Sequence, residues 1–235
     1  MTLKRIAFIL YFMCLASTMA IAQKEKAKNL PYTDNRLFHL GFFVGLHSQD
    51  LLLTNSGSSY NGETWFAEIP NYSQGFSVGV IGDMYLSRFF NLRFTPSIHF
   101  GDKQFVFKKE NSEETFKTNV RSNYLMFPLD IKYSALRLNN YRPYLLGGIY
   151  GAFDLGRKKG TPILLKGPDF GVEFGIGCDI YLPFFKLCPE LKFCFGLADV
   201  LEKDRSDLQG QETIKYTEGL SRATSRMVVL TFNFE

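Results

Sequence analysis

The stretch Phe170–Leu182 has the sequence FGVEFGIGCDIYL, and its pattern decides the fold. Every second residue is apolar, whereas the residues between are glycines, Glu173, Asp179 and Tyr181. Successive side chains of a β-strand point to opposite faces, so this alternation predicts a strand with one apolar and one polar face. The stretch is longer than an ordinary strand of about five or six residues and suits a tilted strand that crosses a membrane.

The same alternation occurs eight times along the chain. The expected strands cover residues 38–47, 74–86, 90–107, 121–134, 142–155, 169–182, 186–198 and 223–235. Short connections fall near 87–89, 135–141 and 183–185, and long polar ones at 48–73, 108–120, 156–168 and 199–222. Short turns at one end and long loops at the other are typical of outer-membrane barrels. The sequence therefore predicts an all-β protein, an eight-stranded antiparallel up-and-down transmembrane β-barrel.

Charged residues fall on the strand face opposite the large apolar side chains. In a membrane barrel the apolar face meets lipid and the other face lines the interior. A buried charge needs a partner, so these side chains are expected to pair inside the barrel, with the acids in excess unless Arg121 or Arg142 reaches in. The expected luminal charged residues are Asp83, Arg93, Asp130, Lys132, Glu173, Asp179, Glu190 and Lys192.

Three prolines lie inside expected strands: Pro96, Pro128 and Pro189. A proline cannot donate a hydrogen bond to the ladder, and a closed barrel has no edge strand on which to place it. The sequence therefore predicts a β-bulge at each of the three.

The first 22 residues have the features of a secretory signal peptide. Lys4 and Arg5 precede an apolar run, and Ala20-Ile21-Ala22 forms a cleavage site of small residues. An uncleaved anchor is disfavoured because the run is shorter than the roughly 20 residues that a span needs. We expect residues 1–22 to be the signal peptide, 23–37 a periplasmic N-terminal segment and 38–235 a barrel integral to the outer membrane, with both mature termini in the periplasm.

Composition excludes several other classes. The chain is 46% hydrophobic, which is incompatible with general disorder. The formal net charge is +4, of which Lys4 and Arg5 supply half, so the nearly neutral mature chain offers no electrostatic basis for binding nucleic acid. Cys188 and Cys194 lie on one expected strand, roughly 20 Å apart, which is too far for a disulfide.

Few residue patterns point to chemistry. Ser97 and His99 share a strand face, as the nucleophile and base of a lipid hydrolase would, or as hydrogen-bonded filler of the interior. His39 and His47 are roughly 26 Å apart on a strand and cannot share a metal ion. We therefore expect no catalytic residue, metal, cofactor or small-molecule substrate.

Loops and turns offer candidate contact surfaces. The loop 156–168 is basic, which fits either contact with lipopolysaccharide or simple solvation. The loop 48–73 is aromatic, which fits either an interaction loop or a rim at the membrane interface. The predicted loop contacts are Tyr60, Trp65, Arg157, Lys158 and Lys159. The short-turn side is expected to be basic through Arg88, Arg137, Arg142 and Lys186.

Several strings resemble the PorT family of Bacteroidota. They are FNLRF at 90–94, YLMFPL at 124–129, RLNNYRPY at 137–144, GCDIYLPFFK at 177–186 and TSRMVVL at 224–230. The resemblance covers nearly all of the chain after residue 22. It implies an outer-membrane barrel that supports the type IX secretion system, which exports cargo bearing a C-terminal signal domain, and it brings no catalytic residues.

An eight-stranded barrel has an interior that side chains fill, so a protein cannot be threaded through it. The expected role is therefore assembly or support of the translocon rather than the conduit, with outer-membrane lipid, lipopolysaccharide and other secretion-system proteins as partners. The alternatives are a structural or ligand-binding outer-membrane barrel and, less favoured, a lipid-modifying hydrolase built on Ser97 and His99.

Overall fold

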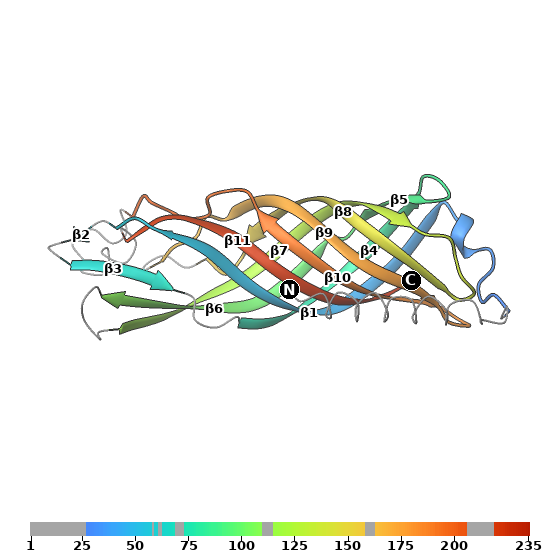
Figure 1. Ribbon diagram of the computed structural model, residues 1–235, viewed down its shortest axis with the longest axis horizontal. Helices are drawn as coiled ribbons and strands as arrows, with labels where there is room; N and C mark the ends of the chain where they lie inside the picture. The colour runs from blue at the N-terminus through green and yellow to red at the C-terminus, as the bar shows by residue number, and fades with distance from the viewer. Residues whose placement is uncertain are drawn as a thin grey trace, which may run out of the picture.

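The computed structural model describes residues 27–57, 59–60, 63–68, 73–109, 115–157, 163–205 and 219–235. The predicted signal peptide, 1–22, lies outside the described residues, as do Lys158 and Lys159. The described chain forms a long, narrow cylinder of tilted strands (Figure 1). Within these ranges no helix has the length and apolar character to cross a membrane.

Eleven strands form within the described ranges. They are β1 (Phe38–Asn55), β2 (Ser59–Tyr60), β3 (Glu63–Glu68), β4 (Ser73–Tyr85), β5 (Phe90–Phe94), β6 (Ser97–Lys109), β7 (Thr115–Ser134), β8 (Tyr141–Asp154), β9 (Pro168–Tyr181), β10 (Lys186–Gly196) and β11 (Leu220–Phe234). Each of the eight expected strands is present, and β5 and β6 are the two halves of one of them. A one-turn 3₁₀ helix, Thr33–Asn35, precedes β1.

The strands close into a ring. The antiparallel order is β1, β4, β5 with β6, β7, β8, β9, β10 and β11. The first and last strands then pair with each other, with Phe42 opposite Phe234 and Leu53 opposite Ala223. The predicted eight-stranded antiparallel up-and-down barrel is therefore confirmed.

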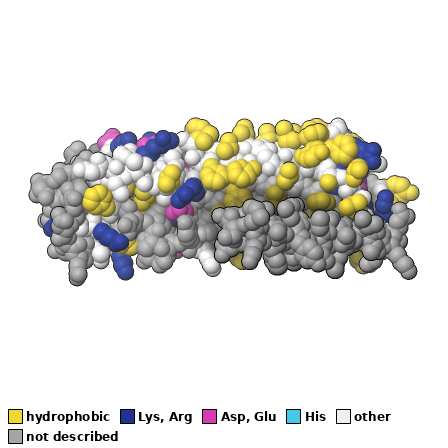
Figure 2. All heavy atoms as spheres, in the orientation of Figure 1, with side chains coloured by type: hydrophobic (Ala, Val, Ile, Leu, Met, Phe, Trp, Pro, Cys, Tyr) yellow, Lys and Arg dark blue, Asp and Glu magenta, His cyan; other side chains and the backbone are white. Residues whose placement is uncertain are grey.

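The two-residue alternation separates the side chains into an outer and an inner set. Leu40, Phe42 and Leu46 of β1 point outward and are more than half exposed, as are Ile131 of β7 and Ile149 of β8. These and similar side chains form an apolar area over the part of the wall toward the short turns (Figure 2). Such an area is the surface that a barrel presents to lipid.

Two long connections are shorter than the sequence predicts. β1 continues to Asn55, while β6 extends to Lys109 and β7 begins at Thr115, so much of 48–73 and 108–120 is strand. β3 pairs with the end of β6 and lengthens the wall further. Here Thr115 and Lys117 of β7 are exposed in place of apolar side chains, which removes the apolar face from the pattern. The prediction of loops was wrong because a strand beyond the apolar surface has polar side chains on its outer face.

The prediction of β-bulges at the prolines was also wrong. Pro128 and Pro189 stay in register with their partner strands. Pro96 separates β5 from β6, yet both halves keep the same register with β7. The carbonyls of Pro96 and Pro128 still accept hydrogen bonds from Val80 N (3.1 Å) and Thr95 N (3.2 Å). Each proline removes one donor without inserting a residue, so the ladder loses a bond and keeps its spacing.

Candidate functional site: the barrel interior and its two ends

The interior is the candidate site because the polar residues singled out by the sequence converge there. One end of the barrel carries the turns 86–89, 135–140 and 182–185 and is called the short-turn end. The opposite end carries the connections between β8 and β9 and between β10 and β11, and is called the long-loop end. The eight predicted luminal charges lie toward the short-turn end, His47 and His99 lie in the middle, and an apolar cluster closes the long-loop end.

Arg93 is the centre of the charged group nearest the short turns. Its fully buried guanidinium contacts Asp83 (Nε to Oδ2, 2.9 Å), Glu190 (Nη1 to Oε2, 3.0 Å) and Glu235 (Nη2 to Oε1, 2.6 Å). The planar fork of arginine presents five N–H donors and so can serve three carboxylates at once. Arg93 thereby joins β5, β4, β10 and the end of the chain.

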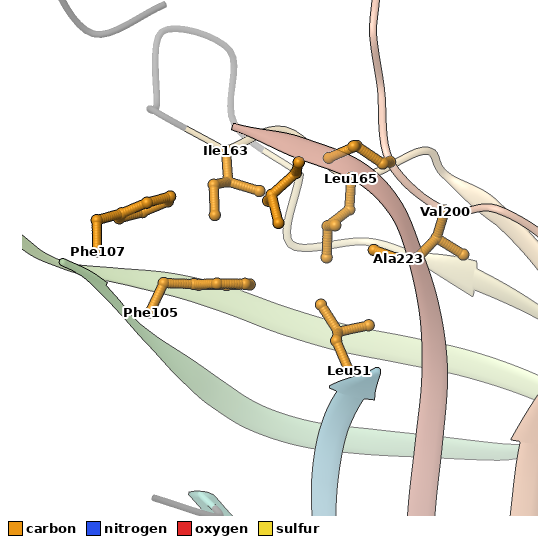
Figure 3. Close-up of a cluster of buried hydrophobic side chains, with 9 residues drawn as sticks. Leu51, Phe105, Phe107, Ile163, Leu165, Val200 and Ala223 are labelled. Atoms are coloured by element: carbon orange, nitrogen blue, oxygen red, sulfur yellow. The ribbon is translucent and has the colours of Figure 1, made fainter. Parts of the chain in front are cut away.

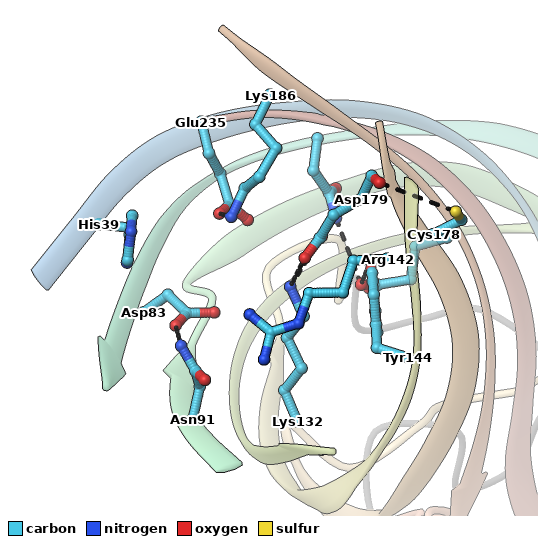
Figure 4. A network of polar contacts seen from close by, with 12 residues as sticks. His39, Asp83, Asn91, Lys132, Arg142, Tyr144, Cys178, Asp179, Lys186 and Glu235 are labelled. Carbon is cyan, nitrogen blue, oxygen red and sulfur yellow. Dashed lines mark hydrogen bonds and ion pairs between the residues drawn. The ribbon is translucent and has the colours of Figure 1, made fainter. Parts of the chain in front are cut away.

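Lys132 forms a second buried pair, with Asp179. The ammonium donates to both carboxylate oxygens at 2.8 and 2.9 Å (Figure 4). It also lies 4.0 Å from the ring centroid of Tyr144, a cation–π distance. The hydroxyl of Tyr144 donates to Glu190 Oε2 at 2.6 Å, which connects this pair to the Arg93 group.

Lys192 is the centre of a third group. Its ammonium lies 2.8 Å from Glu173, 3.4 Å from Asp130 and 3.6 Å from Glu190. The structure thus places all eight predicted luminal residues inside the barrel, each less than 10% exposed. Their ion pairs join neighbouring strands, as in Lys192 with Glu173, and also strands on opposite sides of the ring, as in Arg93 with Glu190.

The alternation does not predict two members of this network. Lys186 and Glu235 are buried and pair with each other at 2.6 Å (Figure 4). Lys186 is therefore not part of a basic surface, contrary to expectation. Each lies at the extreme end of its strand, where too few residues remain to establish a face. Arg121 does not reach in, since its side chain is 66% exposed.

Wall glycines make room for these side chains. A Cβ at Gly148 would overlap the carboxylate of Asp130 and the backbone of β7. A Cβ at Gly177 would overlap the ring of Tyr144. Inward-facing glycines of β8 and β9 therefore make room for the large polar side chains of the residues paired with them on the neighbouring strands.

Removing a luminal base should cost more stability than neutralising a luminal acid. Lys132→Ala leaves Asp179 buried without its direct base, at an expected cost of roughly 3 kcal/mol in the free energy of unfolding. Asp130→Asn keeps the shape of the side chain, and Lys192 retains Glu173 and Glu190. Denaturant unfolding of the two variants in the same detergent measures the difference. Equal midpoints would contradict this description of the interior.

Histidines occupy the middle of the interior. His47 and His99 lie with ring centroids 5.1 Å apart, and Gln49 is hydrogen bonded to His47 at 2.7 Å. Ser97 Oγ lies 3.1 Å from His99 Nε2, the contact of a nucleophile and its base. Both side chains are buried within the wall, and His99 Nδ1 has no hydrogen-bond partner among the described residues. A lipid hydrolase needs an orienting acid and access to its substrate, and among the described residues neither is found at this pair.

An apolar cluster closes the long-loop end (Figure 3). Leu165 and Leu201, from two different connections, pair through an isolated antiparallel bridge and are both buried. Among the described residues next to this cap, a cavity of about 20 Å³ lies beside Lys103 and Tyr124, enough for about one water molecule. The members of the cap are Leu51, Phe105, Phe107, Ile163, Leu165, Val200, Leu201, Leu220 and Ala223.

The segment 27–37 is tied to the short-turn end. Asp34 lies 3.4 Å from Arg137 and 3.6 Å from Arg142, and it accepts a hydrogen bond from the hydroxyl of Tyr181. The Arg137 guanidinium stacks over the Tyr181 ring at 3.6 Å, and Asn29 N donates to Asn140 Oδ1 at 2.9 Å. Two of the bases expected to form a free basic surface are thus held by the chain's own N-terminal segment.

The structure describes three of the five predicted loop contacts. Tyr60 lies in the short strand β2 and Trp65 in β3, opposite Lys109. Arg157 forms an ion pair with Glu202 at 3.0 Å, which reduces the positive charge of its loop. Lys158 and Lys159 lie outside the described residues, so a shared contact surface of these five residues stays a prediction.

A closed ring of eight tilted strands with an apolar outer surface and a charged, filled interior defines an outer-membrane β-barrel protein. The sequence matches the family "Outer membrane protein beta-barrel domain" over residues 21–202, and the chain belongs to this family. A comparison with curated proteins gives no match.

Three solved structures are similar to this chain at low identity. OprG from Pseudomonas aeruginosa is 12% identical, with a TM-score of 0.42, over 84% of this chain and 93% of that one. Neisserial surface protein A is 10% identical, with a TM-score of 0.40, over 82% and 95%. AlkL, solved by solid-state NMR in lipid bilayers, is 12% identical, with a TM-score of 0.43, over 90% and 93%.

Proposed function

We propose that this barrel is an outer-membrane component of the type IX secretion system and acts in assembly or support of the translocon. The resemblance to the PorT family supports the choice of system. Two of the strings that carry it, 137–144 and 177–186, contain Arg137, Arg142 and Tyr181, which bind the N-terminal segment. Part of the family resemblance therefore lies at the end of the barrel that we expect to face the periplasm.

The filled interior is the observation that carries the supporting role. A folded or unfolded polypeptide needs an opening far wider than a cavity of about 20 Å³. Opening one would require breaking the Arg93, Lys132 and Lys192 groups and displacing the apolar cap. Contacts with partner proteins are then expected on surfaces outside the lumen, as in a protein that stabilises a larger translocon.

Copurification tests the proposal directly. A tagged chain solubilised from the outer membrane in mild detergent should bring down other secretion-system proteins. A variant lacking residues 206–218, which lie outside the described ranges, keeps the cap residues Val200, Leu201 and Leu220. We expect this variant to stay folded, to recover less partner and to export cargo more weakly. Recovery of the chain alone, at normal barrel abundance, would reject the secretion role.

The alternative is a structural or ligand-binding barrel that has no part in secretion. It predicts the same fold and the same filled interior, but normal export of cargo in a strain that lacks the gene. A hydrolase is less well supported, because Ser97 and His99 are enclosed by the wall.

A further inference from the structure

A pocket of about 370 Å³ opens at the short-turn end, between the N-terminal segment and two turns of the barrel. Lys28 and Asp34 line it from the segment, Arg88 from the turn after β4, and Arg137 and Arg142 from the hairpin between β7 and β8. Its volume lies within the range of small-molecule sites. Three separate parts of the chain thus meet around one concave space.

The pocket carries excess positive charge. Four bases line it, and Asp34 is the one acid in its lining. Asp34 is shared between Arg137 and Arg142. Lys28 and Arg88 are exposed and have no carboxylate partner in the part of the chain that the structure describes. The two bases are therefore available to an anion from outside the protein.

Apolar side chains line the same pocket. Leu136 and Leu138 are 53% and 67% exposed, and Ile131 and Tyr133 on the adjoining strand point outward into the apolar surface. The pocket therefore lies where the lipid-facing wall ends. At that level a membrane presents acyl chains on one side and phosphate groups on the other.

We propose that this pocket binds the phosphate headgroup of an anionic phospholipid, with an acyl chain along Leu136 and Leu138. Arginine and lysine form charge-assisted hydrogen bonds with phosphate oxygens. An acidic peptide would use the same bases but would leave the exposed leucines unused, so the amphiphile fits the lining better. Bound lipid would connect Lys28 of the N-terminal segment to Arg88 of the barrel. The proposal does not depend on the role in secretion.

Native mass spectrometry of the mature chain tests this site. Complexes released from nanodiscs of phosphatidylglycerol and phosphatidylcholine should retain phosphatidylglycerol preferentially. Lys28→Gln with Arg88→Gln should weaken that retention about tenfold or more, since two charge-assisted contacts are lost. The matched control is Lys117→Gln with Arg121→Gln, two exposed bases toward the long-loop end, which should retain the lipid as the parent does. Heat-modifiable gel migration verifies that every variant is folded.

Three results would overturn the proposal. Equal retention by the two double variants would place the lipid elsewhere. Full displacement by inorganic phosphate at the concentration of the lipid headgroup would reduce the site to one for free phosphate. Binding of a glutamate-rich peptide in phosphatidylcholine nanodiscs, lost in the Lys28/Arg88 variant, would assign the pocket to an acidic protein segment.

Discussion

Arg93→Ala should lower the free energy of unfolding by about 4 kcal/mol, because it leaves buried carboxylates without their base. Arg93 serves Asp83, Glu190 and Glu235 at once, all of them shielded from water. Glu235 keeps Lys186, and Asp83 keeps a hydrogen bond from Asn91 at 2.5 Å, so part of the network survives. Asp83 depends most on Arg93, because Glu190 keeps Lys192 and the Tyr144 hydroxyl, so adding Asp83→Asn should restore part of the loss.

Arg121→Ala is the matched control for this experiment. Arg121 and its partner Asp102 are about two-thirds exposed and 3.7 Å apart, so their ion pair is expected to contribute less than about 1 kcal/mol. Denaturant unfolding followed by gel migration compares both variants with the parent barrel. A stability of Arg93→Ala within about 1 kcal/mol of the parent would show that the interior is wet enough to tolerate unpaired acids.

Deleting the gene should trap type IX cargo in the periplasm. A support protein is needed wherever the translocon must be assembled, so cargo bearing the C-terminal signal domain should accumulate inside the cell envelope. Fractionation and immunoblotting of one secreted protease measure the block, and the parent gene should restore export. Normal export in the deletion strain would instead favour the structural or ligand-binding barrel.

Complementation with Ser97→Ala separates support from catalysis. The serine lies 3.1 Å from His99 and has no described role beyond this contact. The variant should restore export as well as the parent does, since filling the interior does not require a nucleophile. Failure of Ser97→Ala to restore export at normal barrel abundance would instead favour the lipid-hydrolase hypothesis.

The fold could be predicted because side chains of a barrel strand face lipid and the interior in turn, and this alternation of apolar and polar residues is visible in the sequence. Phe170–Leu182 shows this most clearly, and β9 spans Pro168–Tyr181. Alternation no longer reveals a strand beyond the apolar surface, where the outer face turns polar, so Thr115 and Lys117 conceal the first residues of β7. The β-bulge predicted at Pro189 is absent for a different reason. Losing one hydrogen-bond donor costs a closed ladder less free energy than inserting a residue, so the strand keeps its register.

The interior could be predicted only in part. Alternation identifies which residues point inward, such as Lys132, but not that its partner is Asp179 two strands away. That pairing depends on the tilt and register of the closed ring. The apolar cap is even harder to predict from the sequence, because Leu165 and Leu201 come from separate connections that pair with each other. The ion pairs of Asp34 with Arg137 and Arg142 also join residues that are far apart in the sequence.

A disulfide across the cap tests most directly whether the barrel is a conduit. Leu165 and Leu201 face each other as a non-hydrogen-bonded antiparallel pair, flanked by hydrogen bonds from Lys166 N to Val200 O (2.7 Å) and from Glu202 N to Leu164 O (3.0 Å). Such pairs have Cα atoms about 4.5 Å apart, within the range that a disulfide spans. Leu165→Cys with Leu201→Cys should therefore lock the long-loop end shut once oxidised.

The measurement is cargo export by cells whose only copy is the locked double variant, with the oxidised fraction quantified on non-reducing gels. Each single-cysteine variant serves as the control for the substitutions themselves. We expect the locked barrel to export cargo as the parent does, because the interior has only a structural role. Export that stops in the oxidised variant at normal barrel abundance and resumes on reduction would show that cargo passes through this barrel.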